Sequence, residues 1–124
     1  MTMKLIVTKE VEVTHQNIDD LMITAFEGGI SYWCSNAKLV CNGACQLTWL
    51  RADGTKRTTA EMLSQGYDIE LHDSEAGESY ILTIEKFITG LTRWLSEGGN
   101  LEDYDADDAD KIVQYALFNE LVYG

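Results

Sequence analysis

The side chains most able to do chemistry in this sequence are carboxylates, and they are concentrated in its second half. The 124 residues include 21 acids and 9 bases, for a formal net charge of −12. Acids and bases cancel from residue 1 to 57, so the whole surplus lies between residues 58 and 124. A field of this sign repels nucleic acid and attracts basic proteins and cations. The asymmetry indicates a surface for a basic partner, with acidity that serves solubility alone as the alternative.

Nine acids and one tyrosine form the predicted partner-binding surface. If alternate residues of the strand around Ile69 face the core, Asp68 and Glu70 point to water about 7 Å apart. Repeated negative charge at this spacing resembles a phosphate backbone, which a protein that holds DNA through Lys and Arg could accept instead. Tyr104 lies inside the acid tract and suits a contact with an arginine. The predicted residues are Asp68, Glu70, Glu75, Glu78, Glu102, Asp103, Tyr104, Asp105, Asp107 and Asp108.

Patterns for catalysis and zinc binding are weak. The two histidines are His15 and His72, and His72-Asp73 is the candidate acid–base pair. Neighbours in a strand point to opposite faces, so these two side chains need not meet. The three cysteines lack the Cys-x-x-Cys spacing of zinc sites and are interpreted as buried thiols in a reducing compartment: Cys34, Cys41 and Cys45.

The segment that starts at Asp103 begins like a calcium-binding loop, with Asp at positions one, three and five. Position six is Asp108, where glycine is needed, and position twelve is Gln114, where glutamate is needed. We therefore expect the aspartates here to stabilise the start of the last helix through its dipole. The sequence predicts no metal, no cofactor and no enzymatic activity.

The elements that must position these residues are mixed strands and helices. Period-two alternation predicts a strand over residues 3–13 and hairpins over 45–58 and 67–83. Helical spacing predicts a helix from the N-cap Thr14 to the glycines at 28–29, a short one over 58–66, and a third over 84–97. Residues 30–40 fit either a strand or a helix. A last helix has as its expected buried face Ile112, Val113, Ala116, Leu117 and Leu121.

This mixture predicts an α+β fold, an antiparallel sheet of hairpins packed by about three to four helices, in a single domain over residues 1–124. Trp33, Trp49 and Trp94 are expected in the core. No apolar run approaches the ~20 residues of a bilayer span. The first residues lack the pattern of a secretion signal, so we expect a cytoplasmic protein.

Two segments, Glu27 to Cys34 and Asp105 to Phe118, resemble a family of small acidic proteins carried by phages and prophages of Gram-positive bacteria. The hairpin at Leu71-His72-Asp73 and the helix after it also fit, and residues 38–57 match least well. The resemblance implies no catalytic residue. It does imply an accessory role, since phage proteins of this size and acidity often bind host defence machinery, as anti-CRISPR and anti-restriction proteins do.

The leading expectation is a phage-encoded inhibitor of the DNA-mimic type, which binds the basic nucleic-acid-binding surface of a host defence nuclease. The leading partner is a Cas nuclease, with no direct contact to nucleic acid or membrane. The first alternative is a self-associating phage accessory or structural protein, a homodimer formed through Leu121-Val122-Tyr123. The second is a small hydrolase or metal-dependent enzyme that uses His72 or a cysteine.

Overall fold

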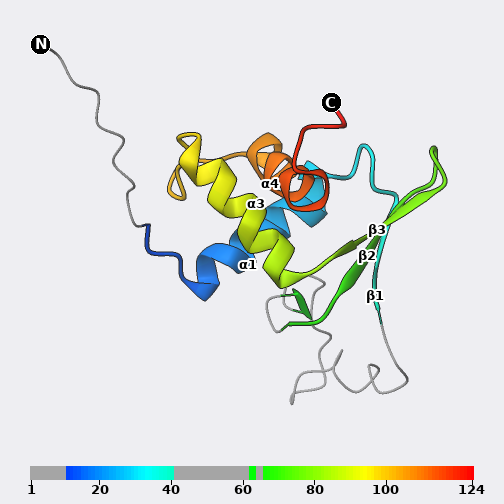
Figure 1. Cartoon of the computed structure of the whole chain (residues 1–124), viewed down its shortest axis with the longest axis horizontal. Helices are drawn as coiled ribbons and strands as arrows, with labels where there is room; N and C mark the ends of the chain where they lie inside the picture. Colours follow the sequence, from blue (N-terminus) through cyan, green and yellow to red (C-terminus); the bar gives the residue numbers. More distant parts are fainter. Residues whose placement is uncertain (1–10, 41–61, 64–65) are drawn as a thin grey trace, which may run out of the picture.

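The computed structural model describes residues 11–40, 62–63 and 66–124. In this part, three α-helices and a three-stranded antiparallel sheet form an α+β fold, which confirms the predicted class. The helices lie together on one side of the sheet (Figure 1). The predicted hairpin at 45–58 and most of the predicted strand at 3–13 and helix at 58–66 lie outside the described residues.

Helix α1 (His15–Thr24) begins where the sequence predicts it, because Thr14 forms a capping box with Asn17. The Thr14 hydroxyl accepts the Asn17 backbone N–H at 3.1 Å, and the Asn17 side chain accepts the Thr14 backbone N–H at 3.0 Å. The helix continues as one π-helical turn, η1 (Ala25–Gly29). Such widened turns are rare and are often found at functional sites.

The sheet has the strand order β1-β2-β3, with every neighbouring pair antiparallel: β1 (Asn36–Leu39), β2 (Ile69–Asp73) and β3 (Glu78–Leu82). The ambiguous segment 30–40 therefore forms a turn followed by a strand. Along β2, Ile69, Leu71 and Asp73 are buried, so they face the helices. Leu71 pairs with Ala37 on one side and with Tyr80 on the other.

Helix α3 (Ile84–Ser96) follows β3 directly, and Thr83 caps its first turn. Of the apolar residues at helical spacing that predict this helix, Phe87, Leu91 and Trp94 are buried. Ile88 is an exception at 40% exposed. Ile88 is exposed because α3 packs mainly against one neighbour, helix α4 (Ala106–Phe118). The apolar residues of α3 extend over a wider part of the helix surface than the contact with α4 covers.

Helix α4 starts with a second capping box. The Asp105 carboxylate accepts the Asp108 backbone N–H at 3.0 Å, and the Asp108 carboxylate accepts the Asp105 backbone N–H at 3.1 Å. The helix ends at Asn119, whose φ of 58° turns the chain out of the helix. The expectation that Leu121 belongs to the buried face of this helix is wrong, since it follows that turn and is 49% exposed.

The core lies between the sheet and the three helices. Its fully buried members come from every layer: Leu21, Met22, Met62, Leu63, Ile69, Leu71, Leu82, Phe87, Ile112 and Val113. Trp33 and Trp94 are each 5% exposed, as predicted for core residues, and Trp49 lies outside the described residues. Within the part of the chain that the structure describes, no helix combines the length and apolarity that crossing a membrane needs.

Candidate binding pocket

Asp110 is a buried carboxylate in the second turn of α4, only 6% exposed. It accepts three hydrogen bonds: from the Tyr32 hydroxyl at 2.6 Å, the Trp33 indole N–H at 2.8 Å and the Gln114 amide at 2.9 Å. All three donors are neutral, so hydrogen bonds rather than a cation satisfy this buried charge. Asp110 therefore fixes the turn that carries Tyr32 and Trp33 against α4.

Gly29 makes this approach possible. A Cβ on Gly29 would overlap the backbone carbonyl oxygen of Ala106, at the start of α4. Without a side chain, the end of η1 can lie directly on α4, which places Tyr32 within reach of Asp110. The sequence predicts Gly28-Gly29 only as a helix end, and the structure adds this close contact between two helices.

Gln114, one helical turn after Asp110, holds the last residues of the chain. Its side-chain oxygen accepts the backbone N–H groups of Val122 at 2.7 Å and Tyr123 at 2.9 Å. The Tyr123 ring then stacks on Trp33, with centroids 4.6 Å apart and an angle of 1° between the planes. A single face of α4 thus brings together segments near residues 32 and 123.

Asp73 completes this network from the sheet. Its carboxylate accepts the Tyr123 hydroxyl at 2.8 Å and the backbone N–H groups of Glu75 and Ala76 at 3.0 and 3.2 Å. The Tyr123 hydrogen bond is the main reason that the pKa of Asp73 lies below its usual range. Burial, reinforced by the hydrogen bond to Asp110, raises the pKa of Tyr32 to about 12.

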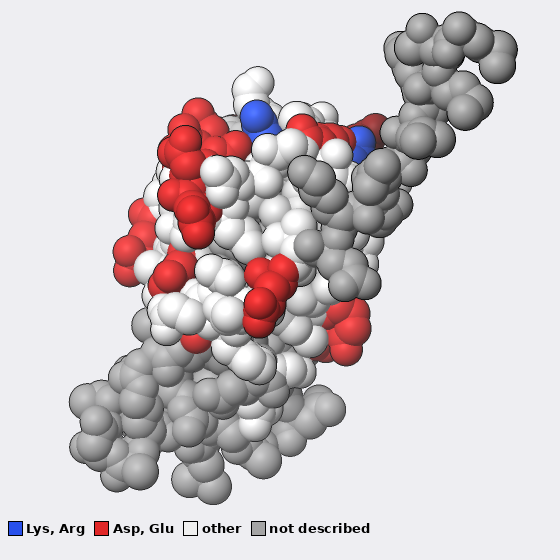
Figure 2. All heavy atoms as spheres, turned by 90° about the vertical axis from the view of Figure 1, so that its left-hand side faces the viewer, with Lys and Arg blue, Asp and Glu red and all other residues white. Residues whose placement is uncertain are grey.

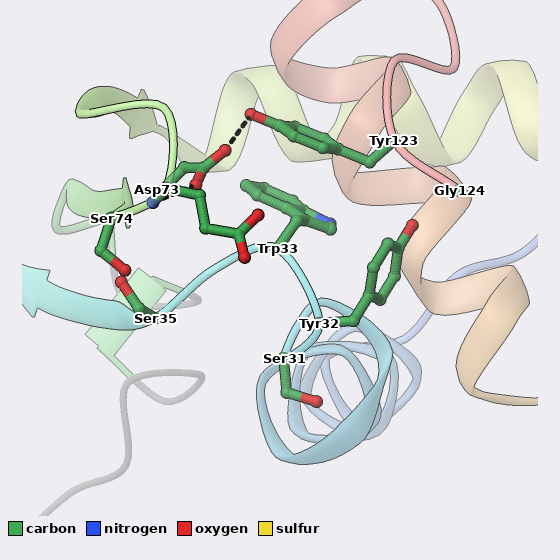
Figure 3. Close-up of a pocket in the computed structure, with 9 residues that line it drawn as sticks. Ser31, Tyr32, Trp33, Ser35, Asp73, Ser74, Tyr123 and Gly124 are labelled. Atoms are coloured by element: carbon green, nitrogen blue, oxygen red, sulfur yellow. Dashed lines mark hydrogen bonds between the residues drawn. The ribbon is translucent and has the colours of Figure 1, made fainter.

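These groups surround a pocket of about 380 Å³ (Figure 3). In the close-up, the ring of Tyr32 lies across the pocket from Asp73 and Ser74, and Trp33 lies between them, stacked with Tyr123. Among the described residues that line it there is no histidine, lysine or arginine, so this part of the pocket holds aromatic rings and carboxylates without a cation. The lining residues are Ser31, Tyr32, Trp33, Ser35, Asp73, Ser74, Glu75, Tyr123 and Gly124.

The predicted acidic surface falls into two groups. The hairpin acidic group lies just before β2, on β2, on β3 and in the turn between the two strands: Asp68, Glu70, Glu75 and Glu78. The α4 acidic group lies at the start of α4 and in the connection before it: Glu102, Asp103, Asp105, Asp107 and Asp108. The β2–β3 turn is at the right of Figure 1 and the α3–α4 connection is at the left. The structure keeps the two groups apart, and within the hairpin acidic group Glu78 pairs with the buried Asp73, so it lies on the other face of the sheet from Glu70.

Figure 2 looks at the side of the molecule that carries the α3–α4 connection and shows several separate acidic patches with uncharged surface between them. Within the α4 acidic group, Asp105 and Asp108 also cap the helix. Tyr104 is half-buried, and its ring stands edge-on against Trp94 at 6.4 Å. Of the ten predicted residues, only Glu75 also lines the pocket.

The candidates for catalysis do not converge in the described residues. His72 and Asp73 point to opposite faces of β2, and His72 instead lies 2.9 Å from the Ser79 hydroxyl. Cys34 is half-buried and burial raises the pKa of its thiol, whereas Cys41 and Cys45 lie outside the described residues. No group of three or more His, Cys, Asp or Glu side chains suited to a metal ion occurs in the described segments.

The segment predicted to mediate self-association is divided. Leu121 and Val122 are 49% and 51% exposed, but Tyr123 is half-buried and its ring stacks on Trp33. Leu121 and Val122 alone therefore remain on the surface for such a contact. Searches for similar proteins return no matching family model, no matching curated protein and no matching solved structure.

Proposed function

We propose that this chain is a non-catalytic protein that binds a basic, nucleic-acid-binding surface of another protein. A host defence nuclease is the leading partner, and a Cas nuclease is the first to test, in line with the resemblance to phage proteins. Binding would block the surface that otherwise holds DNA or RNA, because carboxylates occupy the place of phosphates.

Uncompensated negative charge is the observation that carries this proposal. Of the 21 acids, 18 lie in the described residues, whereas 4 of the 9 bases do: Lys38, Lys86, Arg93 and Lys111. Among these residues the one ion pair between such a base and a carboxylate joins Arg93 to Glu97 at 3.2 Å. Nearly all of the carboxylates are at least partly exposed, with Asp73 and Asp110 as the buried exceptions. Within the described residues, most of this charge is therefore available to a partner rather than paired with a base.

The α4 acidic group is the better candidate for this contact. Glu102, Asp103 and Asp107 are exposed and lie close together in the sequence around a helix start. The Asp105–Asp108 capping box fixes the backbone that carries them. In the hairpin acidic group, by contrast, Glu70 lies opposite Lys38 in the neighbouring strand, which offsets part of its charge.

The proposal is tested by charge reversal. The triple variant Glu102→Lys, Asp103→Lys and Asp107→Lys leaves both capping residues in place. Its matched control reverses three exposed acids elsewhere, Glu12→Lys, Glu85→Lys and Glu120→Lys, so both variants have the same net charge. The measurement is inhibition of DNA cleavage by a purified, guide-loaded Cas nuclease and by a restriction endonuclease, at low and at high salt.

We expect the wild-type chain and the control to inhibit at least one nuclease, competitively with DNA and more weakly at high salt. The α4 triple variant is expected to inhibit at least about tenfold less, since each desolvated charge pair contributes on the order of 1.5 kcal/mol or more. Inhibition that survives both the reversal and high salt would contradict the role of this surface, as would the absence of inhibition in every nuclease tested.

A further inference from the structure

The pocket between the β2–β3 turn and the turn before β1 has two walls of different chemistry. One wall is the start of the β2–β3 turn, which supplies Asp73, Ser74 and Glu75. The other is the turn before β1 together with the chain end, which supplies Tyr32 and Tyr123 (Figure 3). Its volume of about 380 Å³ is within the range of known ligand pockets, on the order of 300–1,000 Å³.

The carboxylate wall carries negative charge that no cation offsets within the described residues. Within the described segments, the hydrogen bonds to Asp73 come from neutral donors, the Tyr123 hydroxyl and two backbone N–H groups. The Glu75 side chain makes no hydrogen bond and no ion pair with the described part of the chain, although its backbone N–H is bound to Asp73. A ligand with positive charge would therefore find an unoccupied carboxylate at the rim of the pocket.

The aromatic wall suits the same kind of ligand. Tyr32 is 55% exposed although its hydroxyl is tied to Asp110 at 2.6 Å. That hydrogen bond fixes the ring in place, and donation to a carboxylate increases the electron density of the ring. A fixed, electron-rich ring with an open face attracts a cation placed above it. The serine hydroxyls of Ser31, Ser35 and Ser74 add acceptors around the same space.

We propose that this pocket receives the side chain of an arginine from the basic partner, with its guanidinium between the Tyr32 ring and the Glu75 carboxylate. Arginine fits better than lysine because a planar guanidinium stacks on an aromatic ring and presents several donors at once. An anion such as a phosphate is repelled by the two carboxylates. The inference rests on the proposed function for the source of the arginine, but the chemistry of the pocket does not depend on it.

A pair of small probes tests the pocket directly. N-acetyl-arginine amide carries the guanidinium, and N-acetyl-citrulline amide replaces it with a neutral urea of nearly the same shape. Each is titrated into the isotopically labelled chain at low salt, and amide and indole resonances are followed by NMR. We expect the arginine probe to shift the Trp33 indole and the Tyr32 and Glu75 amides, with a dissociation constant on the order of millimolar. The citrulline probe is expected to shift them much less.

Two matched variants locate the charge that matters. Glu75→Gln removes the carboxylate at the rim and leaves its backbone hydrogen bond to Asp73 intact. Glu78→Gln removes one carboxylate from the start of β3, opposite Asp73 but outside the pocket lining. Binding of the arginine probe is expected to weaken about two- to fivefold in Glu75→Gln, the range of an exposed ion pair, and to stay unchanged in Glu78→Gln.

Three results would overturn the inference: equal shifts from arginine and citrulline probes, equal affinity in the two variants, or shifts confined to the α4 acidic group. These results can be told apart from failure of the proposed function. If the nuclease is inhibited but the arginine probe does not bind the pocket, only the pocket inference fails. If the probe binds the pocket but no nuclease is inhibited, the proposed function fails and the pocket remains a guanidinium site.

Discussion

Asp110 is the residue on which the turn before β1 depends. It accepts hydrogen bonds from Tyr32, Trp33 and Gln114, and none of these three donors is a cation. Asp110→Asn keeps the size of the side chain but replaces one acceptor oxygen with an NH₂ group. At least one of the three donors that now bind Asp110 then loses its acceptor. We expect the free energy of unfolding to fall by about 1 to 3 kcal/mol, measured by chemical denaturation.

Asp107→Asn is the control for that measurement, because Asp107 is an exposed aspartate in the first turn of the same helix. Its loss is expected to be within about 1 kcal/mol, the usual size of a charge–dipole effect at a helix start. Equal losses in the two variants would show that the buried hydrogen bonds of Asp110 add nothing beyond that effect.

The contact between Asp73 and Tyr123 predicts how stability depends on pH. Because the folded-state pKa of Asp73 is lowered, its contribution is present above the unfolded pKa of about 4 and is lost as pH falls through the folded pKa. Tyr123→Phe removes the largest cause of that shift. We expect this variant to be less stable at neutral pH and to lose less stability below about pH 4, measured by denaturation across pH.

The same relation between pKa and stability provides a control variant and a prediction for high pH. Tyr104→Phe removes a hydroxyl with no hydrogen bond to the described residues, so its acid limb should match the wild type. At high pH the raised pKa of Tyr32 gives stability that is complete below about 10 and is lost as pH rises toward about 12. If the stability of Tyr123→Phe falls as steeply in acid as that of the wild type, then Asp73 is not the cause of the loss of stability at low pH.

At the scale of elements, the crossing of α3 and α4 depends on one missing side chain. A Cβ on Gly90 would overlap the backbone carbonyl oxygen of Ile112 and approach the backbone N–H of Ala116. Backbone atoms cannot rotate away, so Gly90→Ala forces the two helices apart. We expect a loss of about 1 to 3 kcal/mol in the free energy of unfolding, although alanine favours a helix by about 1 kcal/mol over glycine elsewhere.

Thr89→Ala is the matched control in the same helix. Thr89 is exposed and its hydroxyl only binds back to the Glu85 carbonyl, so alanine should change stability by no more than about 0.5 kcal/mol. If Gly90→Ala proves as stable as this control, then the close approach of the helices does not limit the fold.

Periodicity and capping in the sequence predict the elements whose causes are local. The Thr14 cap, the stripe of α3 and the alternation of β2 all depend on residues within a few positions of one another. The segment 30–40 stays ambiguous because the position of its turn depends on Asp110, which lies 77 residues after Trp33. Periodicity also counts Leu121 as helical, since it does not register the end of the helix at Asn119.

The candidate site is harder to predict than the fold. Asp110 and Gln114 are one turn apart in α4, on the same face as Leu117, so a helical plot places two polar groups on the buried side. That signal is present in the sequence, but a carboxylate beside a helix start has a simpler interpretation as a dipole contact. The pocket itself joins residues near 32, 74 and 123, and no local pattern relates these three positions.

At the scale of the whole molecule, the charge total is set by the sequence but its distribution is set by the fold. The acids between residues 68 and 108 are read together as one surface in the sequence. The fold places the β2–β3 turn and the α3–α4 connection at opposite ends (Figure 1). A partner surface therefore meets one acidic group at a time, unless it is concave enough to reach both ends. For this reason the α4 and hairpin acidic groups need separate variants.

The hydrogen bonds from Val122 and Tyr123 to Gln114 affect the order in which parts of the fold can form during synthesis. Trp33 is made early, yet the ring that covers it belongs to Tyr123, 90 positions further along. A growing chain can form the α1 end and the β2–β3 pair while translation continues, since domains begin to fold from the part already made. Closure of the aromatic stack must wait until residue 123 has left the ribosome, so this part of the fold cannot form until all the residues between Trp33 and Tyr123 have been made.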